Sequence, residues 1–560
     1  MKITGISKNN ELCNPKLLHI NRLPRRSTVI PAEKSDIYYR NKYESERILS
    51  LNGEYKFLYR NSDTAPDFYE SLYDDSSWDT IDVPSMWQFR GYGKCRYPNT
   101  EYSIPFNPPY VCCENPVGYY RKRFEIKKNF AKTFIHFGGV DNAFYAYING
   151  RFVGFSKGSR NFAEFDVSDF LTEGENILAV KVFTYSDATY LENQDMLLAS
   201  GIFRDVYLIN MHEDYVWDYR ATGDASGFSV EVASEGNAEI ETEIDGIVKH
   251  GKNTRFDIEN PRLWNAEQPN LYKLTIRLKK DGKIIETHSK KIGIISTELK
   301  HGNFLVNGSP IYIKGVNRHE SFGTNGRAIP EWLIEKELRM IKDNNLNAIR
   351  CSHYTNNPVF YELCSEIGIY VMDEADIESH GCEVTGDQGY LAKRPEWFDA
   401  FRDRVTAMLE QNKNEPCVFM HSMGNENGKG ENIEKCLEIS KAFDPSVVSV
   451  GGMQETSYDL ENDSGKNEYI RRTGYINEET LRKYMGKFSC VMMTEYAHAM
   501  GNSPGFLENY YDIMYNSDNY FGGFVWEFKN HGFVCGDDVL YGGDFGENRE
   551  IHWKNFCLDG

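Results

Sequence analysis

Two glutamates each follow an apolar run of the kind that forms a buried strand. Glu495 closes the run VMMTE, and Glu426 follows HSMGN. Burying a carboxylate without partners is costly, so each of them must point into a wet cleft or be tightly paired. Two carboxylates across a pocket can hydrolyse a glycosidic bond, one as a general acid with a raised pKa and the other as nucleophile or base. A structural ion pair with Arg318 or Arg350 is the alternative.

Polar residues end several other apolar runs in the second half of the chain. In a (β/α)8 barrel, the C-terminal ends of the strands line the active site. A single polar ending is usually a helix cap or a loop contact, but the repetition predicts a shared pocket. The residues at these ends are Asn317, Arg318, His319, Ser352, His353, Glu374, Asn425, Glu426, Glu495 and Trp526.

The stretch DIESHGC contains two candidate metal ligands, Glu378 and His380. Hard oxygen ligands suit Mg²⁺, and a single histidine is compatible with them. A lone glutamate and histidine two positions apart are more often part of an ordinary polar loop, so the pattern alone leaves both interpretations open.

The elements around these residues alternate between apolar strands and amphipathic helices. One helix is marked by Phe398, Phe401, Val405 and Met408, which are spaced by 3, 4 and 3 residues. Eight such strand candidates over ~250 residues predict a (β/α)8 barrel. A doubly wound sheet is the alternative, but no Gly-rich phosphate loop follows the first strand. The sixth strand candidate, EYIRRTGYI, is unusual because it contains arginines in place of apolar residues.

The first half of the chain has a different pattern, with short alternating strands and turns such as Asn149-Gly150. This pattern predicts a β-sandwich up to about residue 210, and the alternation from 213 to 298 predicts a second, smaller one.

Composition limits the classes of function. The formal net charge of −20 disfavours nucleic acid and anionic membranes as partners, so a small neutral or cationic substrate is favoured. The chain contains 36 Tyr and 33 Phe, which suit β-rich domains and stacking on sugars. Its 12 cysteines have scattered spacings, which is typical of reduced thiols. We expect a cytoplasmic location, because the sequence shows neither a signal-peptide core nor a run of ~20 apolar residues.

Ordered motifs along nearly the whole chain resemble those of the large bacterial β-galactosidases of glycoside hydrolase family 2. The motifs are LNGEYKFLY, VPSMWQ, NPPYV, YLENQDM, SGIFRDV, GVNRHE, NAIRCSHY, DEADIESHG, MGNENG, TEYAHAMGN, GGFVWEF and YGGDFG. The resemblance implies a jelly-roll sugar-binding-like domain with an N-terminal extension (1–212), an immunoglobulin-like sandwich (213–298) and a (β/α)8 TIM barrel (299–560) whose last helix is missing. It also implies retaining hydrolysis of β-galactosides such as lactose by double displacement.

The resemblance further implies roles for individual residues. Glu495 matches the nucleophile, and Glu426 matches the acid/base. Glu378, His380 and Glu426 match a Mg²⁺ site, and Asp195, Phe556 and Asp559 match a Na⁺ site, although asparagine is common at the last position. The residues that match substrate-binding positions are Asn99, Asp195, His319, His353, Asn425, Tyr475, His498 and Trp526.

Departures from the family pattern leave alternatives. His421 and Leu197 stand where tryptophan is common, which predicts an altered site for the leaving group. The family's two later domains are not in this sequence, so we expect a homo-oligomer or a companion chain that supplies them, or an inactive fragment. A β-glucuronidase or β-mannosidase of the same family is the remaining alternative. The expected Asn-Lys pair for a sugar carboxylate is missing, and this disfavours the glucuronidase.

Overall fold

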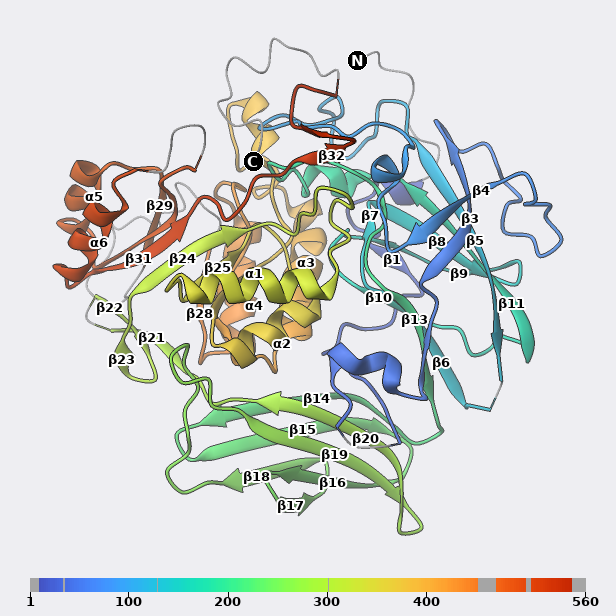
Figure 1. Ribbon diagram of the computed structural model, residues 1–560, viewed down its shortest axis with the longest axis horizontal. Coiled ribbons are helices and arrows are strands. Elements are labelled where there is room, and N and C mark those ends of the chain that lie inside the picture. Colours follow the sequence, from blue (N-terminus) through green and yellow to red (C-terminus); the bar gives the residue numbers. More distant parts are fainter. Residues whose placement is uncertain are drawn as a thin grey trace.

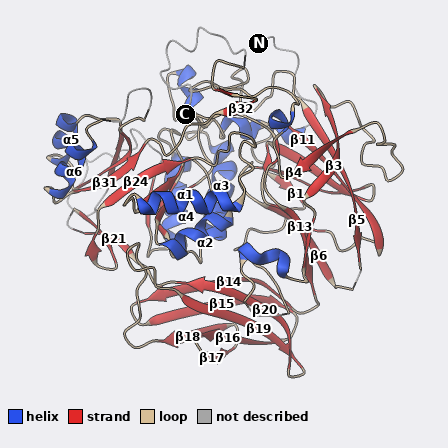
Figure 2. Ribbon diagram, in the orientation of Figure 1, coloured by secondary structure: helices blue, strands red, loops and turns tan. Residues whose placement is uncertain are grey.

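The computed structural model describes residues 10–33, 36–127, 129–300, 302–451, 470–499 and 505–545. Two strand-rich units flank a parallel sheet that carries most of the helices (Figure 1). Colouring by secondary structure shows the same division (Figure 2). The predicted fold class, antiparallel sandwiches followed by a parallel (β/α) barrel domain, is confirmed.

The first unit is a sandwich of a seven-stranded and a four-stranded antiparallel sheet. The first sheet consists, in spatial order, of β1 (His19–Ile20), β9 (Arg151–Lys157), β8 (Ala143–Ile148), β11 (Gly174–Phe183), β5 (Val117–Ile126), β3 (Gly53–Arg60) and β4 (Asp79–Val83). The second consists of β10 (Ala163–Asp166), β6 (Lys132–Phe137), β13 (Val206–Met211) and β2 (Ile48–Ser50).

Strand β11 shows why this sandwich is not an isolated module. Leu178 and Val180 point into the core between its two sheets, whereas Ala179 and Phe183 belong to a second core that also contains barrel residues. Side chains alternate between the faces of a strand, so β11 is buried on both sides. The first sheet is therefore packed against the barrel domain through its outer face.

The second unit is a smaller sandwich whose core is formed by residues from two antiparallel sheets, among them Val216, Phe228, Leu274 and Ile276. One sheet consists of β14 (Tyr215–Asp224), β15 (Gly227–Glu235) and β18 (Asn253–Asp257). The other consists of β17 (Ile247–His250), β16 (Glu239–Ile244), β19 (Tyr272–Lys280) and β20 (Lys283–Ile292).

The third unit is one sheet of eight parallel strands. They are β24 (Ile313–Arg318), β25 (Ala348–Cys351), β26 (Tyr370–Glu374), β27 (Val418–Ser422), β28 (Val448–Val450), β29 (Ile470–Gly474), β30 (Cys490–Tyr496) and β31 (Tyr520–Val525). The first strand, β24, pairs with the last, β31, as in a barrel. Within the described residues β28 and β29 are not paired, and residues 452–469 between them lie outside the description.

Six α-helices are described on this sheet. They are α1 (Glu331–Asp343), α2 (Pro358–Ile367), α3 (Phe398–Asn412), α4 (Glu431–Phe443), α5 (Glu478–Met485) and α6 (Leu507–Tyr515). The predicted helix at Phe398 is α3, and its Phe401, Val405 and Met408 are buried. After β31, residues 526–545 form a hairpin, β32 (Phe533–Cys535) and β33 (Asp538–Leu540), and no helix.

Short sheets complete the description. They are the pair β7 (Val140–Asp141) and β12 (Gly201–Ile202), and the set β21 (Thr297–Lys300), β22 (Asn303–Val306) and β23 (Ser309–Pro310). Among the described helices, none combines the length and apolarity that crossing a bilayer requires. The cysteines of the described residues are free thiols, and all but Cys535 are buried.

Candidate active site

One buried arginine connects the polar strand ends. Arg350 lies on β25, and its guanidinium contacts residues of four other strand ends or loops. It donates to both carboxylate oxygens of Glu374 at 3.0 Å and to Oε1 of Glu495 at 2.7 Å. It also donates to the amide oxygens of Asn317 at 3.1 Å and Asn425 at 2.9 Å. The C-terminal ends of parallel strands meet at one edge of the sheet, and Arg350 fixes their relative positions there.

The predicted nucleophile, Glu495, is held by this arginine and lies near His353. Its Oε1 is 3.9 Å from Nε2 of His353, and its side chain is 6% exposed. The ion pair with Arg350 that the sequence offered as an alternative is therefore present. Arg318, the other candidate partner, instead pairs with Glu337 at 2.8 Å. An ion pair through one oxygen still leaves a carboxylate capable of attack, so it does not by itself exclude a chemical role.

Glu374 is the fully buried member of the network. Besides Arg350, its carboxylate accepts from Ser422 Oγ at 2.6 Å and lies 2.7 Å from Nδ1 of His353. Burial alone would raise the pKa of Glu374, but Arg350 and His353 lower it to about 2. Glu374 therefore stays ionised and orients Arg350 and His353 rather than exchanging protons near neutral pH.

The predicted metal ligands Glu378, His380 and Glu426 are brought together. One ligand atom from each lies within 4.8 Å of the others, and Nδ1 of His380 is 2.5 Å from Oε2 of Glu426. Glu378 is fully buried, and neither of its carboxylate oxygens has a hydrogen-bond partner among the described residues. Burial and the nearby charge of Glu426 raise the pKa of Glu378 well above its ordinary value.

The protonation of Glu426 differs from the expectation for a general acid. Burial raises its pKa, but the charge and hydrogen bond of His380, together with the charges of His353 and Arg350, lower it more, so the net pKa of Glu426 lies below its ordinary value. The same contact raises the pKa of His380 to about 9 against the effect of burial. The pKa of Glu426 is thus shifted in the opposite direction from the raised pKa expected of a general acid, because His380, its partner in the predicted Mg²⁺ site, lies against it.

A loop of the first sandwich holds the Glu378 segment in place. The backbone N–H of Glu378 donates to the carbonyl of Leu191 at 2.8 Å, and the N–H of Asn193 donates to the carbonyl of Glu378 at 3.2 Å. The side chain of Asn193 accepts from the N–H of Gly381 at 2.7 Å. Gln194 donates to Asp376 at 3.0 Å, so two domains together build this side of the site.

Asp195 follows that loop and lies on the same side of the pocket. Asn99 Nδ2 is 3.5 Å from its Oδ2, which brings together two predicted sugar contacts. Burial, together with the charge of Glu426, raises the pKa of Asp195 to about 7 despite a hydrogen bond from Tyr97. Phe556 and Asp559, the other predicted Na⁺ ligands, lie outside the described residues.

The aromatic residues and histidines that are predicted to contact the sugar form two groups. His353 and Trp526 stack with ring centroids 5.2 Å apart, and His319 lies edge-on to both, 5.5 Å from His353 and 5.6 Å from Trp526. In the second group, the ring centroids of Tyr475 and His498 are 5.3 Å apart. The N–H of Tyr475 donates to the carbonyl of Glu495 at 2.9 Å, so this pair adjoins the predicted nucleophile.

One arginine of the unusual sixth strand also reaches the network. Arg472 on β29 is buried, and its Nη1 donates to Ser422 Oγ at 3.3 Å. Burial and the charge of Arg350 lower the pKa of Arg472 to about 9. Sequence reasoning noted this arginine but gave it no role. The signal was its presence in a strand candidate where apolar residues are expected.

Family models match all three units. The description "Glycosyl hydrolases family 2, TIM barrel domain" matches residues 297–560, "sugar binding domain" of the same family matches 48–212, and "Glycosyl hydrolases family 2" matches 219–294. The chain belongs to glycoside hydrolase family 2.

Relatives within family 2 include a "Beta-galactosidase" of Staphylococcus xylosus, 36% identical over 98% of this chain and 57% of that protein. A second, from Pectobacterium atrosepticum, is 35% identical over 92% of this chain and 54% of that protein. The chain thus spans about half the length of these relatives. A similar fold is found in β-glucuronidase from Ruminococcus gnavus, with a TM-score of 0.74, 18% identity, and coverage of 92% of this chain and 96% of that one.

Proposed function

We propose that this family 2 glycoside hydrolase is a retaining β-galactosidase that releases terminal β-D-galactose from β-galactosides. The two curated relatives at 36% and 35% identity support the galactoside. The observation that carries the proposal is the Arg350 guanidinium. It contacts both Glu495 and Asn425, the neighbour of Glu426, at 2.7 and 2.9 Å. One guanidinium therefore holds Glu495 and the residue next to Glu426, which supports a site in which the two carboxylates act together.

The reaction follows from these positions. A carboxylate oxygen of Glu495 attacks the anomeric carbon, the glycosidic C–O bond breaks, and Glu426 gives its proton to the leaving oxygen. In the second step Glu426 takes a proton from water, and that water attacks the anomeric carbon and frees Glu495. The first step needs a protonated Glu426. We infer that a bound sugar raises the pKa of Glu426 by excluding water from a carboxylate that is already half-buried.

The donor set at Glu378, His380 and Glu426 fits a magnesium ion. Two carboxylates supply hard oxygen ligands, and the unpartnered buried oxygens of Glu378 are otherwise costly to leave unpaired. A cation bound there would supply positive charge that holds Glu426 in place and tunes its pKa. Asp195 is the described member of the proposed Na⁺ site, whose other members, Phe556 and Asp559, follow from family resemblance alone.

One alternative within the family, a β-glucuronidase, acts on a charged sugar. A β-glucuronide would bring a carboxylate into a pocket that already contains Asp195, Glu378 and Glu426. Burial raises the pKa of Asp195 and Glu378, which shows how poorly this region accommodates further negative charge. A neutral galactoside avoids this repulsion.

A panel of nitrophenyl glycosides tests the proposal. The purified chain, with Mg²⁺ present, is assayed on the β-galactoside, β-glucuronide and β-mannoside. We expect the galactoside to be hydrolysed at least about 100-fold faster than the others, since a site built for one sugar's hydroxyls rejects analogues strongly. Faster hydrolysis of the glucuronide or mannoside would contradict the galactoside assignment. If none of the three glycosides is hydrolysed, the result would support the alternative that the chain is an inactive fragment.

A further inference from the structure

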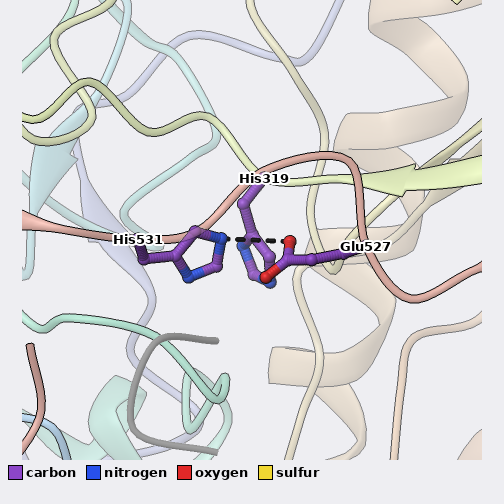
Figure 3. Close-up of side chains that lie close together, drawn as sticks. All are labelled: His319, Glu527 and His531. Carbon is purple, nitrogen blue, oxygen red and sulfur yellow. Dashed lines mark hydrogen bonds and ion pairs between the residues drawn. The ribbon is translucent and has the colours of Figure 1, made fainter. Parts of the chain in front are cut away.

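A second cluster of potential metal ligands lies where the first and last barrel strands meet. His319 follows β24 directly, and Glu527 and His531 lie on the segment after β31. One ligand atom from each of the three lies within 4.8 Å of the others. Figure 3 shows the two imidazoles and the carboxylate converging from these separate segments. The sequence analysis did not identify this cluster as a metal site, because its members are up to 212 positions apart (531 − 319).

The three side chains are buried and incompletely paired. His319 is 1% exposed and His531 is 3% exposed. Nε2 of His319, Oε1 of Glu527 and Nδ1 of His531 are buried atoms without a hydrogen-bond partner among the described residues. Unpaired polar atoms in such a place are destabilising unless a further group satisfies them.

Two members of the cluster are paired with each other at a separation that a shared cation also allows. Nε2 of His531 lies 3.1 Å from Oε2 of Glu527. Two ligands of one tetrahedral zinc ion, each at ~2.0–2.1 Å from the metal, lie about 3.3 Å apart. Nδ1 of His319 is 3.2 Å from the hydroxyl of Tyr354, the kind of second contact that fixes the ring of a metal-ligating histidine. Both histidines also line a cavity of about 20 Å³, which has room for one water-sized ligand.

We propose that His319, Glu527 and His531 bind a zinc-class divalent cation. Two imidazoles and one carboxylate form a donor set that zinc prefers, whereas magnesium prefers oxygen. The cluster therefore differs in selectivity from Glu378, His380 and Glu426, which offer one imidazole and two carboxylates. A cation at this place connects the end of β24 to the segment after β31 and stabilises the junction that closes the barrel.

X-ray absorption at the zinc edge tests the site on the unmodified chain. The protein is first saturated with Mg²⁺, and one equivalent of Zn²⁺ is then added. Scattering from two imidazoles per zinc is the expected result. One imidazole or none would overturn the proposal, because the zinc would then be at the Glu378 cluster or on the surface.

Variants locate the bound zinc. In equilibrium dialysis against Zn²⁺ with excess Mg²⁺, we expect His531→Gln and Glu527→Gln each to weaken binding by at least about tenfold. The matched control is His250→Gln, which changes an exposed histidine that is also paired with a glutamate, Glu239, at 3.2 Å. Zinc should also raise the melting temperature of the unmodified chain and of His250→Gln, but not that of His531→Gln.

Two outcomes of these binding measurements would overturn the site. One is unchanged zinc affinity in both cluster variants, with folding confirmed by circular dichroism. The other is an equal loss of affinity in His250→Gln, which would mean that zinc binds outside the cluster.

Discussion

The two halves of the barrel are built differently. In the first half, from β24 to β27, the strand ends and their loops pack against the first sandwich. A shared core joins Phe155 and Tyr190 of that sandwich to Trp397 and Phe401 of the barrel domain. Two residues of the sandwich loop, Leu191 and Asn193, also form backbone hydrogen bonds with Glu378. The half that contains Glu426 is therefore supported by a second domain.

The second half, from β29 to β31, has its own small core. Leu481 of α5 and Ile513 of α6 pack with Met493 and Tyr520 of the strands. In Figure 1, α5 and α6 lie on the side of the barrel away from the first sandwich. This half contains Glu495, but the residues that contact its carboxylate, Arg350 and His353, come from the first half.

This difference shows how the two carboxylates are positioned. Glu426 contacts His380 of its own half, and the neighbouring domain holds the segment that contains His380. Glu495 depends on an arginine from across the barrel, and that arginine is in turn fixed by Glu374. Arg350 thus couples the two halves of the barrel.

The largest effect is expected from changing each carboxylate. Glu495→Ala should lower galactoside hydrolysis by about 10⁴-fold or more, because the nucleophile is lost. Added azide can then attack the anomeric carbon from the vacated face and yield the α-galactosyl azide. Glu426→Ala with azide should instead yield the β-galactosyl azide, because Glu495 still forms the intermediate. NMR distinguishes the α-galactosyl azide from the β-galactosyl azide. The opposite stereochemistry in each variant would mean that Glu426 is the nucleophile and Glu495 the acid/base.

Removing the coupling residue should have the next largest effect. Arg350→Met leaves Glu374 buried without its main partner, and breaking a buried ion pair costs about 3–5 kcal/mol of unfolding free energy. It should also reduce kcat, because Glu495 loses its contact with the first half. Arg350→Lys keeps the charge but loses the bidentate geometry, so an intermediate effect is expected. The control Arg339→Met breaks only an exposed pair with Glu335. The free energy of unfolding is measured by denaturant titration. Equal losses of this free energy in Arg350→Met and Arg339→Met would contradict the coupling role of Arg350.

Low pH should weaken the contacts between Glu374 and Arg350 over a defined pH range. The pKa of Glu374 is lowered to about 2 from an ordinary value of 4.5, so its stabilisation is fully present above pH 4.5 and is lost as pH falls toward 2. The full contribution is on the order of 3 kcal/mol. Urea midpoints between pH 5.5 and 3 should fall more steeply for the unmodified chain than for Glu374→Gln. Parallel slopes would show that Glu374 does not contribute.

The smallest effect concerns the support from the first sandwich. Asn193→Ala leaves the N–H of Gly381 without its 2.7 Å acceptor, which costs about 1–3 kcal/mol locally. We expect a modest loss of stability and a higher Mg²⁺ requirement for galactoside hydrolysis, because the Glu378 loop is less well fixed. Asn253→Ala, at an exposed residue of β18, is the control. Unchanged Mg²⁺ titrations in Asn193→Ala would show that the first half does not need the sandwich.

The sequence predicted what depends on local pattern. The alternation of strands and helices in the second half of the chain predicted the parallel sheet, and several of the polar residues at its strand ends lie together around Arg350. The sequence offered Arg350 as an ion-pair partner of the two glutamates, but it did not show the contacts of Arg350 with Glu374 and Asn425, which depend on barrel closure. The lowered pKa of Glu426 depends on the rotamer of His380, and the Asn193 contact depends on domain packing. Neither the rotamer of His380 nor the packing of the two domains can be deduced from a local sequence pattern.

The central claim is that Glu495 forms the covalent bond to the sugar. A 2-deoxy-2-fluoro-β-galactoside with a dinitrophenolate leaving group forms the glycosyl-enzyme but slows its hydrolysis, because fluorine destabilises the oxocarbenium-like transition state. Peptide mass spectrometry then identifies the labelled residue. The account predicts a single fluorogalactosyl group on Glu495 and rapid loss of activity. A label on another residue, or continued galactoside hydrolysis with no label, would contradict it.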